Sequence, residues 1–327
     1  MVLASPCNTG FDATMGQETA RRDQSGIALL RTATVDDVDG VLALAQAWAS
    51  GLTNLPPDRG MLAGRIVAVS GIPPRVGAEW PFYSYRLTRQ AGKSRAVGRA
   101  KAQTLRNLVN DFDGETEVGM LFVDLVMRGS ALAALAARGR YLFIAAHRPW
   151  SGQRVMAELR GWQDADGRSP VWEVIGRHFY DMDFSDAHRA GALTRNLFIA
   201  DLGPRYPLYL ALLPSSAQAA LGRPHDEGKA AFDMLIAEGF RAGDYVDIFD
   251  GGPTVAADID AVRTVGEARR LTFSKSGADS QRALVAAGSG AAFRVARGLV
   301  RPEGLVDTAP VNVLDLCVGD EMLVVAA

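Results

Sequence analysis

Two carboxylates beside a forced turn are the residues of this sequence best suited to chemistry. In the segment Tyr-Val-Asp-Ile-Phe-Asp-Gly-Gly-Pro-Thr, residues 245–254, Asp247 and Asp250 flank an apolar pair and precede Gly-Gly-Pro. Glycine can adopt positive φ or admit another backbone at close range, and proline ends a strand ladder. Because functional side chains often lie at such strand ends, we interpret Asp247 and Asp250 as acceptors in a binding site. On a regular strand their spacing would place them on opposite faces.

A second charged pair, Glu158 and Arg160, alternates with apolar residues in 155–160, which we predict to be a strand. Side chains two positions apart share one face of a strand, so both could point into one site. Two interpretations stay open. The pair binds the charged groups of a substrate, or Glu158 forms a structural ion pair with Arg160 or another neighbour.

His225 follows Gly-Arg-Pro and precedes a predicted helix. An imidazole, with an unperturbed pKa of about 6.5, can accept or donate a proton near neutral pH. A lone loop histidine is more often an ordinary surface residue, so its position alone assigns no role.

Strands and helices alternate along the segments that would position these residues. We predict strands at 27–31, 65–70, 80–87, 119–127, 155–160 and from Tyr245, and helices at about 35–49, 131–146, 171–179 and 227–238. This order predicts an α/β fold. Short β-rich pieces follow Asp258, so we expect a small β-rich C-terminal appendage.

The bulk composition is that of an ordinary globular protein, with 48% apolar and 22% charged residues. A formal charge of −2 gives no field that would attract nucleic acid. No apolar run approaches the roughly 20 residues of a membrane span, so we expect no membrane association. Cys7 and Cys317 provide neither a metal site nor a disulfide framework, which favours a cytoplasmic location. Residues 1–26 are polar and mixed in charge, and we expect a mobile extension there.

Several segments, in the same order along the chain, resemble the arginine N-succinyltransferase family. The segments are 51–56, Leu121-Phe-Val-Asp124, Ala157-Glu-Leu-Arg-Gly161, Asp166-Gly-Arg-Ser-Pro170, Gly176-Arg-His-Phe179, Asp181-Met-Asp-Phe-Ser185 and 245–254. The resemblance implies a mixed sheet with flanking helices, similar to the acyl-CoA-dependent N-acyltransferase (GNAT) superfamily. It divides the chain into the extension at 1–26, a GNAT-like acyl-CoA-binding domain at 27–200, an acceptor-side segment at 201–257 and a β-rich subdomain at 258–327.

The same resemblance implies a donor site. Leu121 matches a position that contacts acyl-CoA, and the loop with Arg128, Gly129, Ala131 and Ala133 would hold the pyrophosphate through backbone N–H groups at a helix N-terminus. Ala131 stands where the superfamily has glycine. If it must adopt positive φ, the cost is about 1 kcal/mol. A plain turn without a cofactor is therefore an alternative.

On the acceptor side, the resemblance implies that His225 is catalytic and that Glu158, Arg160, Asp247 and Asp250 bind the substrate. The expected reaction is direct attack of the amine of arginine, ornithine or a related amino acid on succinyl-CoA or another acyl-CoA. Acyl-CoA would be a co-substrate, with no permanently bound cofactor and no metal.

Two other functions compete with this one, because the loop is altered and the segment at 58–79 is shorter than in the family. One is a non-catalytic subunit of a hetero-oligomer, and the other is a biosynthetic enzyme with a changed donor or reaction. Either homo- or hetero-oligomers are compatible with the resemblance.

Overall fold

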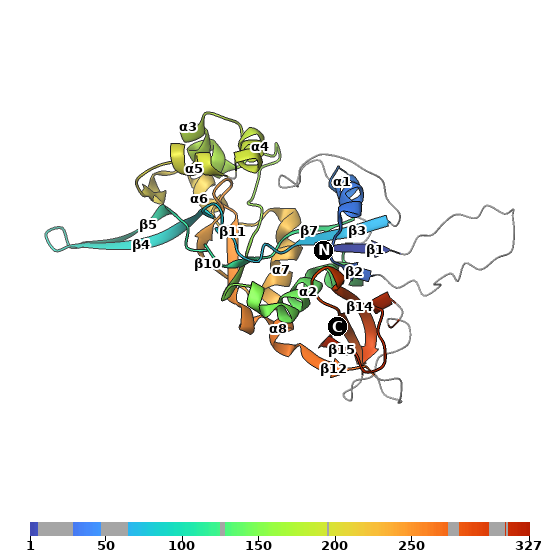
Figure 1. The fold of residues 1–327 in the computed structure, drawn as a ribbon. Helices are drawn as coiled ribbons and strands as arrows, with labels where there is room; N and C mark the ends of the chain where they lie inside the picture. Colours follow the sequence, from blue (N-terminus) through green and yellow to red (C-terminus); the bar gives the residue numbers. More distant parts are fainter. Residues whose placement is uncertain are drawn as a thin grey trace. The chain divides into compact units, whose positions relative to one another are not determined.

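The computed structural model describes residues 1–5, 29–46, 65–124, 128–194, 196–273, 281–300, 311 and 313–327. The chain forms two compact units, each assembled from segments distant in sequence (Figure 1). Unit 1 comprises Met1–Ile72, Met120–Pro149 and Thr264–Ala327, and unit 2 comprises Pro73–Gly119 and Trp150–Arg263. These boundaries differ from those of the predicted domains, which stay a prediction. The family-like loop at 51–56 lies outside the described residues.

Unit 1 is built on an eight-stranded sheet with the order β12-β15-β13-β14-β2-β1-β3-β7. Its strands are β1 (Val2–Ser5), β2 (Leu29–Arg31), β3 (Arg65–Gly71), β7 (Gly119–Val123), β12 (Arg269–Thr272), β13 (Gln281–Ala287), β14 (Arg294–Val300) and β15 (Glu321–Ala326). Strand β14 pairs antiparallel with β2, with Val295 opposite Leu30. The C-terminal part is β-rich as predicted, and its strands continue the N-terminal sheet.

Strand β1 corrects the expectation for the N-terminus. Residues Val2–Ser5 pair antiparallel with both β2 and β3, and the amino group of Met1 donates to the carbonyl of Ser70 at 2.6 Å. A short strand can fill this position because the neighbours on both sides satisfy its backbone groups. The first five residues are therefore part of the fold, while 6–28 lie outside the described residues.

Helix α2 (Ala131–Ala146) has the bounds that the sequence predicts. Ser130 caps it by accepting a hydrogen bond from the backbone N–H of Leu132 at 3.2 Å. Its buried face, with Leu135 and Leu142, packs in a core with Leu30 and Val295 of the sheet. Unit 1 also contains α1 (Val38–Gln46), α8 (Arg263–Glu267, except its first residue) and 3-10 turns at Val35–Asp37, Arg148–Trp150 (except its last residue) and Gly290–Ala292.

Unit 2 is built on a seven-stranded sheet with the order β6-β8-β11-β10-β4-β5-β9. Its strands are β4 (Ser84–Ser94), β5 (Arg99–Val109), β6 (Thr116–Glu117), β8 (Arg154–Glu158), β9 (Leu208–Tyr209), β10 (Arg241–Val246) and β11 (Pro253–Asp258). Strand β6 pairs parallel with β8, whereas β8, β11, β10 and β4 pair antiparallel in turn. Residues 247–252, which we call the acidic turn, therefore connect two neighbouring strands.

Helices cluster around a buried Trp172 in unit 2. A π-helical turn (Trp172–Gly176) and α3 (Arg177–Tyr180) replace the single predicted helix, and Trp172 stacks on Tyr180 with ring centroids 5.4 Å apart. Phe249 of the acidic turn packs 5.9 Å from the same ring, so this core anchors the turn. The remaining helices are α4 (Phe184–Thr194), α5 (Leu197–Leu202), α6 (Ser215–Ala220) and α7 (Lys229–Ala237), with 3-10 turns at Leu210–Leu212, Asp226–Gly228 and Ile259–Ala261.

The predicted mixed α/β fold with flanking helices is confirmed. In the ranges that the structure describes, no helix is long and apolar enough to cross a membrane.

Candidate active site

The acidic turn begins where β10 ends, at Val246. Asp247 is therefore not on a strand, and its Oδ1 accepts hydrogen bonds from the backbone N–H groups of Phe249 at 2.7 Å and Asp250 at 2.9 Å. The opposite-face placement expected for Asp247 and Asp250 does not apply, because the chain has turned between them. Sequence periodicity missed this, since Tyr-Val-Asp-Ile-Phe reads as a continuous strand.

Asp250 joins the acidic turn to the end of β8. It is buried, and its Oδ2 accepts from the backbone N–H of Gly161 at 2.7 Å while its Oδ1 accepts from that of Gly252 at 2.8 Å. Burial and the nearby Asp247 raise the pKa of Asp250 to about 8, against the two N–H donors that favour its ionised form. The predicted acceptor is thus occupied by backbone groups and shapes the site.

Both glycines of the turn are required by geometry. Gly251 has φ +69°, and a Cβ on Gly252 would lie 2.0 Å from the carbonyl oxygen of Leu159. The two backbones thus approach more closely than any side chain allows. The Gly-Gly pair singled out in the sequence therefore permits the contact between the turn and β8.

Glu158 is the last residue of β8 and lies opposite Thr254 of β11. Its side chain is partly accessible and accepts a hydrogen bond from Ser84 Oγ at 3.3 Å. Arg160 instead donates a hydrogen bond to the side chain of Gln163. Among the described residues, Glu158 and Arg160 therefore do not form the ion pair that one interpretation of the sequence proposed. Burial, followed by the charges of Asp247 and Glu117, raises the pKa of Glu158 well above its usual range.

Glu117 completes a group of four acids that we call the carboxylate cluster: Glu117, Glu158, Asp247 and Asp250. Burial raises the pKa of Glu117 from 4.5 to about 7. Nothing in the sequence around Glu117 distinguishes it, because it reaches Glu158 through the parallel pairing of β6 with β8. Among the described residues, no group of acids, histidines and cysteines is arranged to hold a metal ion. A positive charge near the cluster would favour the ionised carboxylates.

Arg106 of β5 is a buried cation that sequence analysis also missed. Its guanidinium lies over the ring of Tyr85, 3.2 Å from the centroid, and its Nε and Nη1 have no hydrogen-bond partner among the described residues. Burial lowers the pKa of Arg106, and Tyr85, Tyr180 and, to a smaller extent, the negative charge of Asp247 act in the opposite direction. Arg106 therefore offsets part of the negative charge of the carboxylate cluster.

His225 is held against the same strand end. Its backbone N–H donates to the carbonyl of Arg160 at 2.8 Å. Nearby, the backbone N–H of Gly222 donates to the carbonyl of Gly251, also at 2.8 Å. Its Nδ1 accepts a hydrogen bond from the backbone N–H of Glu227 at 3.2 Å. Because Nδ1 is an acceptor, the neutral ring carries its proton on Nε2.

The charge environment of His225 favours the same neutral form. Burial and the positive charge of Arg160 lower the pKa of His225, while Glu227 and Asp226 oppose the shift. At neutral pH the side chain thus presents an Nε2–H donor. The sequence indicates neither this tautomer nor the direction of the pKa shift.

The predicted donor residues lie in unit 1 and form a different arrangement. Leu121 is in β7 and packs against the core of this unit, while Arg128 and Gly129 are exposed before Ser130, the cap of α2. Gly129 has φ +69°, whereas Ala131 is the first helical residue and is not at positive φ. The strain expected at Ala131 is absent, because the preceding glycine makes the turn.

Comparisons with known proteins decide the family. The family model described as "Arginine N-succinyltransferase beta subunit" matches residues 63–264. The chain belongs to the arginine N-succinyltransferase family. It is accordingly an acyltransferase.

Relatives of this arginine N-succinyltransferase family member cover most of its length. "Arginine N-succinyltransferase subunit beta" of Pseudomonas aeruginosa is 34% identical over 275 residues, which cover 75% of this chain and 81% of the relative. "Arginine N-succinyltransferase" of Yersinia pestis (strain Pestoides F) is 38% identical over 266 residues, which cover 72% and 76%. A solved structure, "arginine/ornithine succinyltransferase subunit AI" from Pseudomonas aeruginosa, superposes with a TM-score of 0.81 at 27% identity, covering 91% of this chain and 98% of that one.

The predicted family, fold and acyltransferase class are thus confirmed, and the roles of individual residues in this family member stay predictions. The structure brings Glu158, Asp247, Asp250 and the backbone of His225 together within unit 2. Leu121, Arg128, Gly129, Ala131 and Ala133 belong to unit 1.

We predict that Gly252→Ala destabilises the protein by about 3 kcal/mol, because the added methyl group would force the acidic turn away from the Leu159 carbonyl. Chemical denaturation measures this. Gly228→Ala is the control, because a Cβ there has its nearest neighbour 4.0 Å away and φ is −83°. Equal stability of the two variants would contradict the close approach.

We predict that Glu117→Gln changes the pH dependence of stability. Since the pKa of Glu117 is raised from 4.5 to about 7, the folded state binds more protons between these values, and the wild type loses stability as pH rises through them. Glutamine cannot titrate, so the free energy of unfolding of the variant should rise relative to that of the wild type as pH increases. The relative increase should reach about 3 kcal/mol above pH 7.

Unfolding free energies across this pH range test the prediction on Glu117. Glu267→Gln, at an exposed residue of α8, is the control and should follow the wild type. A constant difference between Glu117→Gln and the wild type at every pH would mean that Glu117 titrates normally.

Proposed function

We propose that this protein transfers the succinyl group of succinyl-CoA to the α-amine of arginine. The observation that carries the proposal is the carboxylate cluster of unit 2, in which burial raises the pKa values of Glu117, Glu158 and Asp250, and repulsion from neighbouring carboxylates adds to the shifts of Glu158 and Asp250. Such a cluster is at its most favourable when a cation neutralises it, and a guanidinium offers several donors in a planar fork. The names of the relatives agree with this substrate.

Within the cluster, we assign Glu158 and Asp247 to the guanidinium. Glu158 and Asp247 are both partly accessible, and Asp247 uses only Oδ1 in its hydrogen bonds to the turn. Asp250 contributes charge and holds the turn. Arg160, two residues after the end of β8, is the cation that we assign to the α-carboxylate of the amino acid.

In the reaction, the amine nitrogen attacks the thioester carbonyl carbon directly. A C–N bond forms, the C–S bond breaks, the nitrogen loses a proton and the CoA sulfur gains one. Holding the two reactants in register is the main requirement, and no covalent enzyme intermediate is needed. Ornithine has the same amine and a shorter cationic side chain, so it is the second acceptor to test.

For His225 we propose the role of a neutral hydrogen-bond donor through Nε2. The contact from Glu227 N–H to Nδ1 disfavours both the imidazolium and the tautomer with a free Nε2 lone pair. A neutral imidazole at a helix start can stabilise negative charge that develops on a substrate oxygen. This narrows the expectation from the sequence, in which His225 could accept or donate a proton.

On the donor side, we propose that acyl-CoA is a co-substrate bound by Leu121 and by the loop with Arg128, Gly129, Ala131 and Ala133. The first turn of α2 offers backbone N–H groups and the positive end of a helix dipole, which suit a pyrophosphate. The absence of strain at Ala131 removes the main objection to this site.

A non-catalytic subunit is the second candidate function. It is favoured by the names of a relative, "subunit beta", and of the structural neighbour, "subunit AI". The two candidates differ in what the isolated chain should do with substrates. Mass spectrometry of arginine and ornithine incubated with succinyl-CoA or acetyl-CoA tests them. Formation of N-succinylarginine supports the enzyme, whereas no adduct and no thermal stabilisation by any acyl-CoA supports the subunit.

Replacing His225 should separate the two ring nitrogens. Glutamine places an N–H near the position of Nε2, whereas asparagine places one near Nδ1. We predict that His225→Asn lowers kcat by about a hundredfold and that His225→Gln retains more activity. Steady-state kinetics with succinyl-CoA and arginine measures this. Wild-type turnover in both variants would exclude a catalytic role for His225.

The wild-type pH profile provides a second readout for His225. Because the pKa of His225 is lowered, kcat/KM should fall only as pH drops below the usual histidine range. This acid limb should be absent in His225→Gln. An unchanged limb would assign it to another group.

Replacing Glu158 should weaken binding of the cationic side chain. We predict that Glu158→Gln raises the KM for arginine by about tenfold or more with a small change in kcat, because a charge-assisted hydrogen bond is lost. Citrulline, with a neutral urea in place of the guanidinium, should be affected much less. Glu267→Gln is the control. Equal losses for arginine and citrulline would place Glu158 away from the guanidinium.

A further inference from the structure

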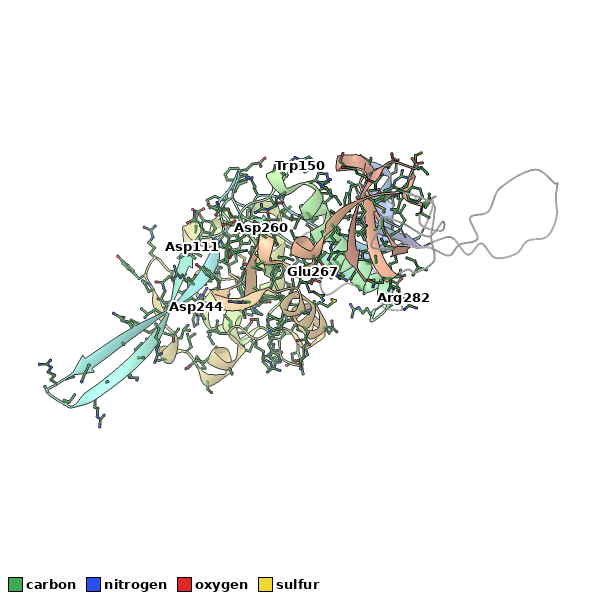
Figure 2. The ribbon with its side chains drawn as sticks, turned by 90° about the horizontal axis from the view of Figure 1, so that it is seen from below. Asp111, Trp150, Asp244, Asp260, Glu267 and Arg282 are labelled. Carbon is green, nitrogen blue, oxygen red and sulfur yellow. The ribbon has the colours of Figure 1, made fainter. Side chains whose placement is uncertain are left out.

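The outer part of the β4–β5 hairpin, residues 88–105, projects beyond the rest of unit 2 (Figures 1 and 2). We call this segment the arm. Its strands pair from Thr88 opposite Leu105 to Ser94 opposite Arg99. Among the described strands, neighbours pair with the hairpin only near the base of the arm, where β10 pairs with Tyr85 and Arg86 and β9 pairs with Leu105 and Arg106. A two-stranded ribbon without a covering layer is marginally stable in water, so the arm has the structure of an element that gains support from a partner.

All charges on the arm are positive. It carries Arg89, Lys93, Arg95, Arg99 and Lys101 and no acidic residue. These five side chains are exposed, and none forms an ion pair with another residue in the described part of the chain. The whole chain has 35 basic and 37 acidic residues, so removing these five basic residues leaves 30 against 37, a net charge of −7.

Large apolar side chains are exposed beside the base of the arm. Tyr206 and Leu212 are each 83% exposed, and Tyr209 of β9 is 41% exposed. Tyr209 is attached to the arm directly, because its hydroxyl donates to Gln90 Oε1 at 3.3 Å and its backbone pairs with Leu105. Tyrosine and arginine are enriched at protein interfaces, and apolar area next to cations is typical of a surface that another protein covers.

We infer that the arm is an interaction surface for a second copy of this chain. Each copy carries one basic arm and a remainder of opposite charge, and exposed acids such as Asp201, Asp233, Asp244 and Asp258 lie elsewhere in unit 2. In a twofold assembly the arm of each copy would contact exposed acids of the other. Figure 2 shows the arm extending away from Asp111 and Asp244, which lie at its base. This inference concerns assembly and goes beyond the proposed reaction, so mass rather than turnover tests it.

Charge reversal on the arm should weaken this association. We predict that the wild type is a dimer or a larger even assembly at low salt, and that Arg95→Glu, Arg99→Glu and Lys101→Glu together raise its dissociation constant by about tenfold or more. Analytical ultracentrifugation at low and high salt measures this, because exposed ion pairs are screened by salt. The matched control reverses Arg168, Lys229 and Arg282, which are exposed outside the arm, and should assemble as the wild type does.

Thermal unfolding shows whether the arm variant folds. The arm contains no residue of the unit 2 core cluster. The triple variant should therefore unfold at the same temperature as the wild-type monomer. A folded arm variant that assembles as tightly as the wild type would overturn the inference. A wild type that is monomeric at all concentrations, or that binds nucleic acid while monomeric, would overturn it as well.

Carbodiimide crosslinking identifies the contact itself. The chain has four lysines, Lys93, Lys101, Lys229 and Lys275, and two of them lie on the arm. In an equal mixture of ¹⁴N- and ¹⁵N-labelled protein, Lys93 or Lys101 should join to an aspartate or glutamate of the other isotope. Crosslinks between copies that involve only Lys229 and Lys275 would place the interface elsewhere.

Discussion

The carboxylate of Asp250, which joins two backbone segments, is the interaction on which the carboxylate cluster of unit 2 depends. One oxygen accepts from Gly161 beyond the end of β8, and the other accepts from Gly252 at the end of the acidic turn. The backbone of Leu159 lies against Gly252 at a distance that excludes any side chain. A buried carboxylate with two N–H donors holds both segments in place, and these segments carry Glu158 and Asp247.

Placing so many acids close together is unfavourable, and the surroundings of the cluster show how this is accommodated. Protonation is favoured at Glu117, Glu158 and Asp250, whose pKa values are raised, and the charge of the buried Arg106 interacts favourably with Asp247. A bound guanidinium would replace the protons by a permanent cation. Substrate binding would then release protons, and affinity for a basic amino acid would increase with pH across the range in which the cluster titrates.

His225 shows how backbone geometry selects one chemistry from the two that an imidazole offers. The hydrogen bond from Glu227 and the charge of Arg160 favour the neutral ring with its proton on Nε2. Its backbone N–H donates a hydrogen bond to the carbonyl of Arg160, so the histidine is oriented by the segment that follows Glu158 at the end of β8. A single local arrangement thus positions the groups that we assign to acceptor binding and to charge stabilisation.

The sequence by itself determined the family, the α/β class and several elements with local signals, such as α2 with its Ser130 cap and the Gly251-Gly252 turn. It also singled out Glu158, His225, Asp247 and Asp250. Tertiary structure decided what no local pattern encodes. Strand pairing brings Glu117 beside Glu158, burial makes Arg106 a countercharge, and the end of β10 at Val246 turns Asp247 and Asp250 out of strand alternation. The physical reason is that capping and turn formation depend on neighbouring residues, whereas burial and charge coupling depend on strands that are distant in sequence.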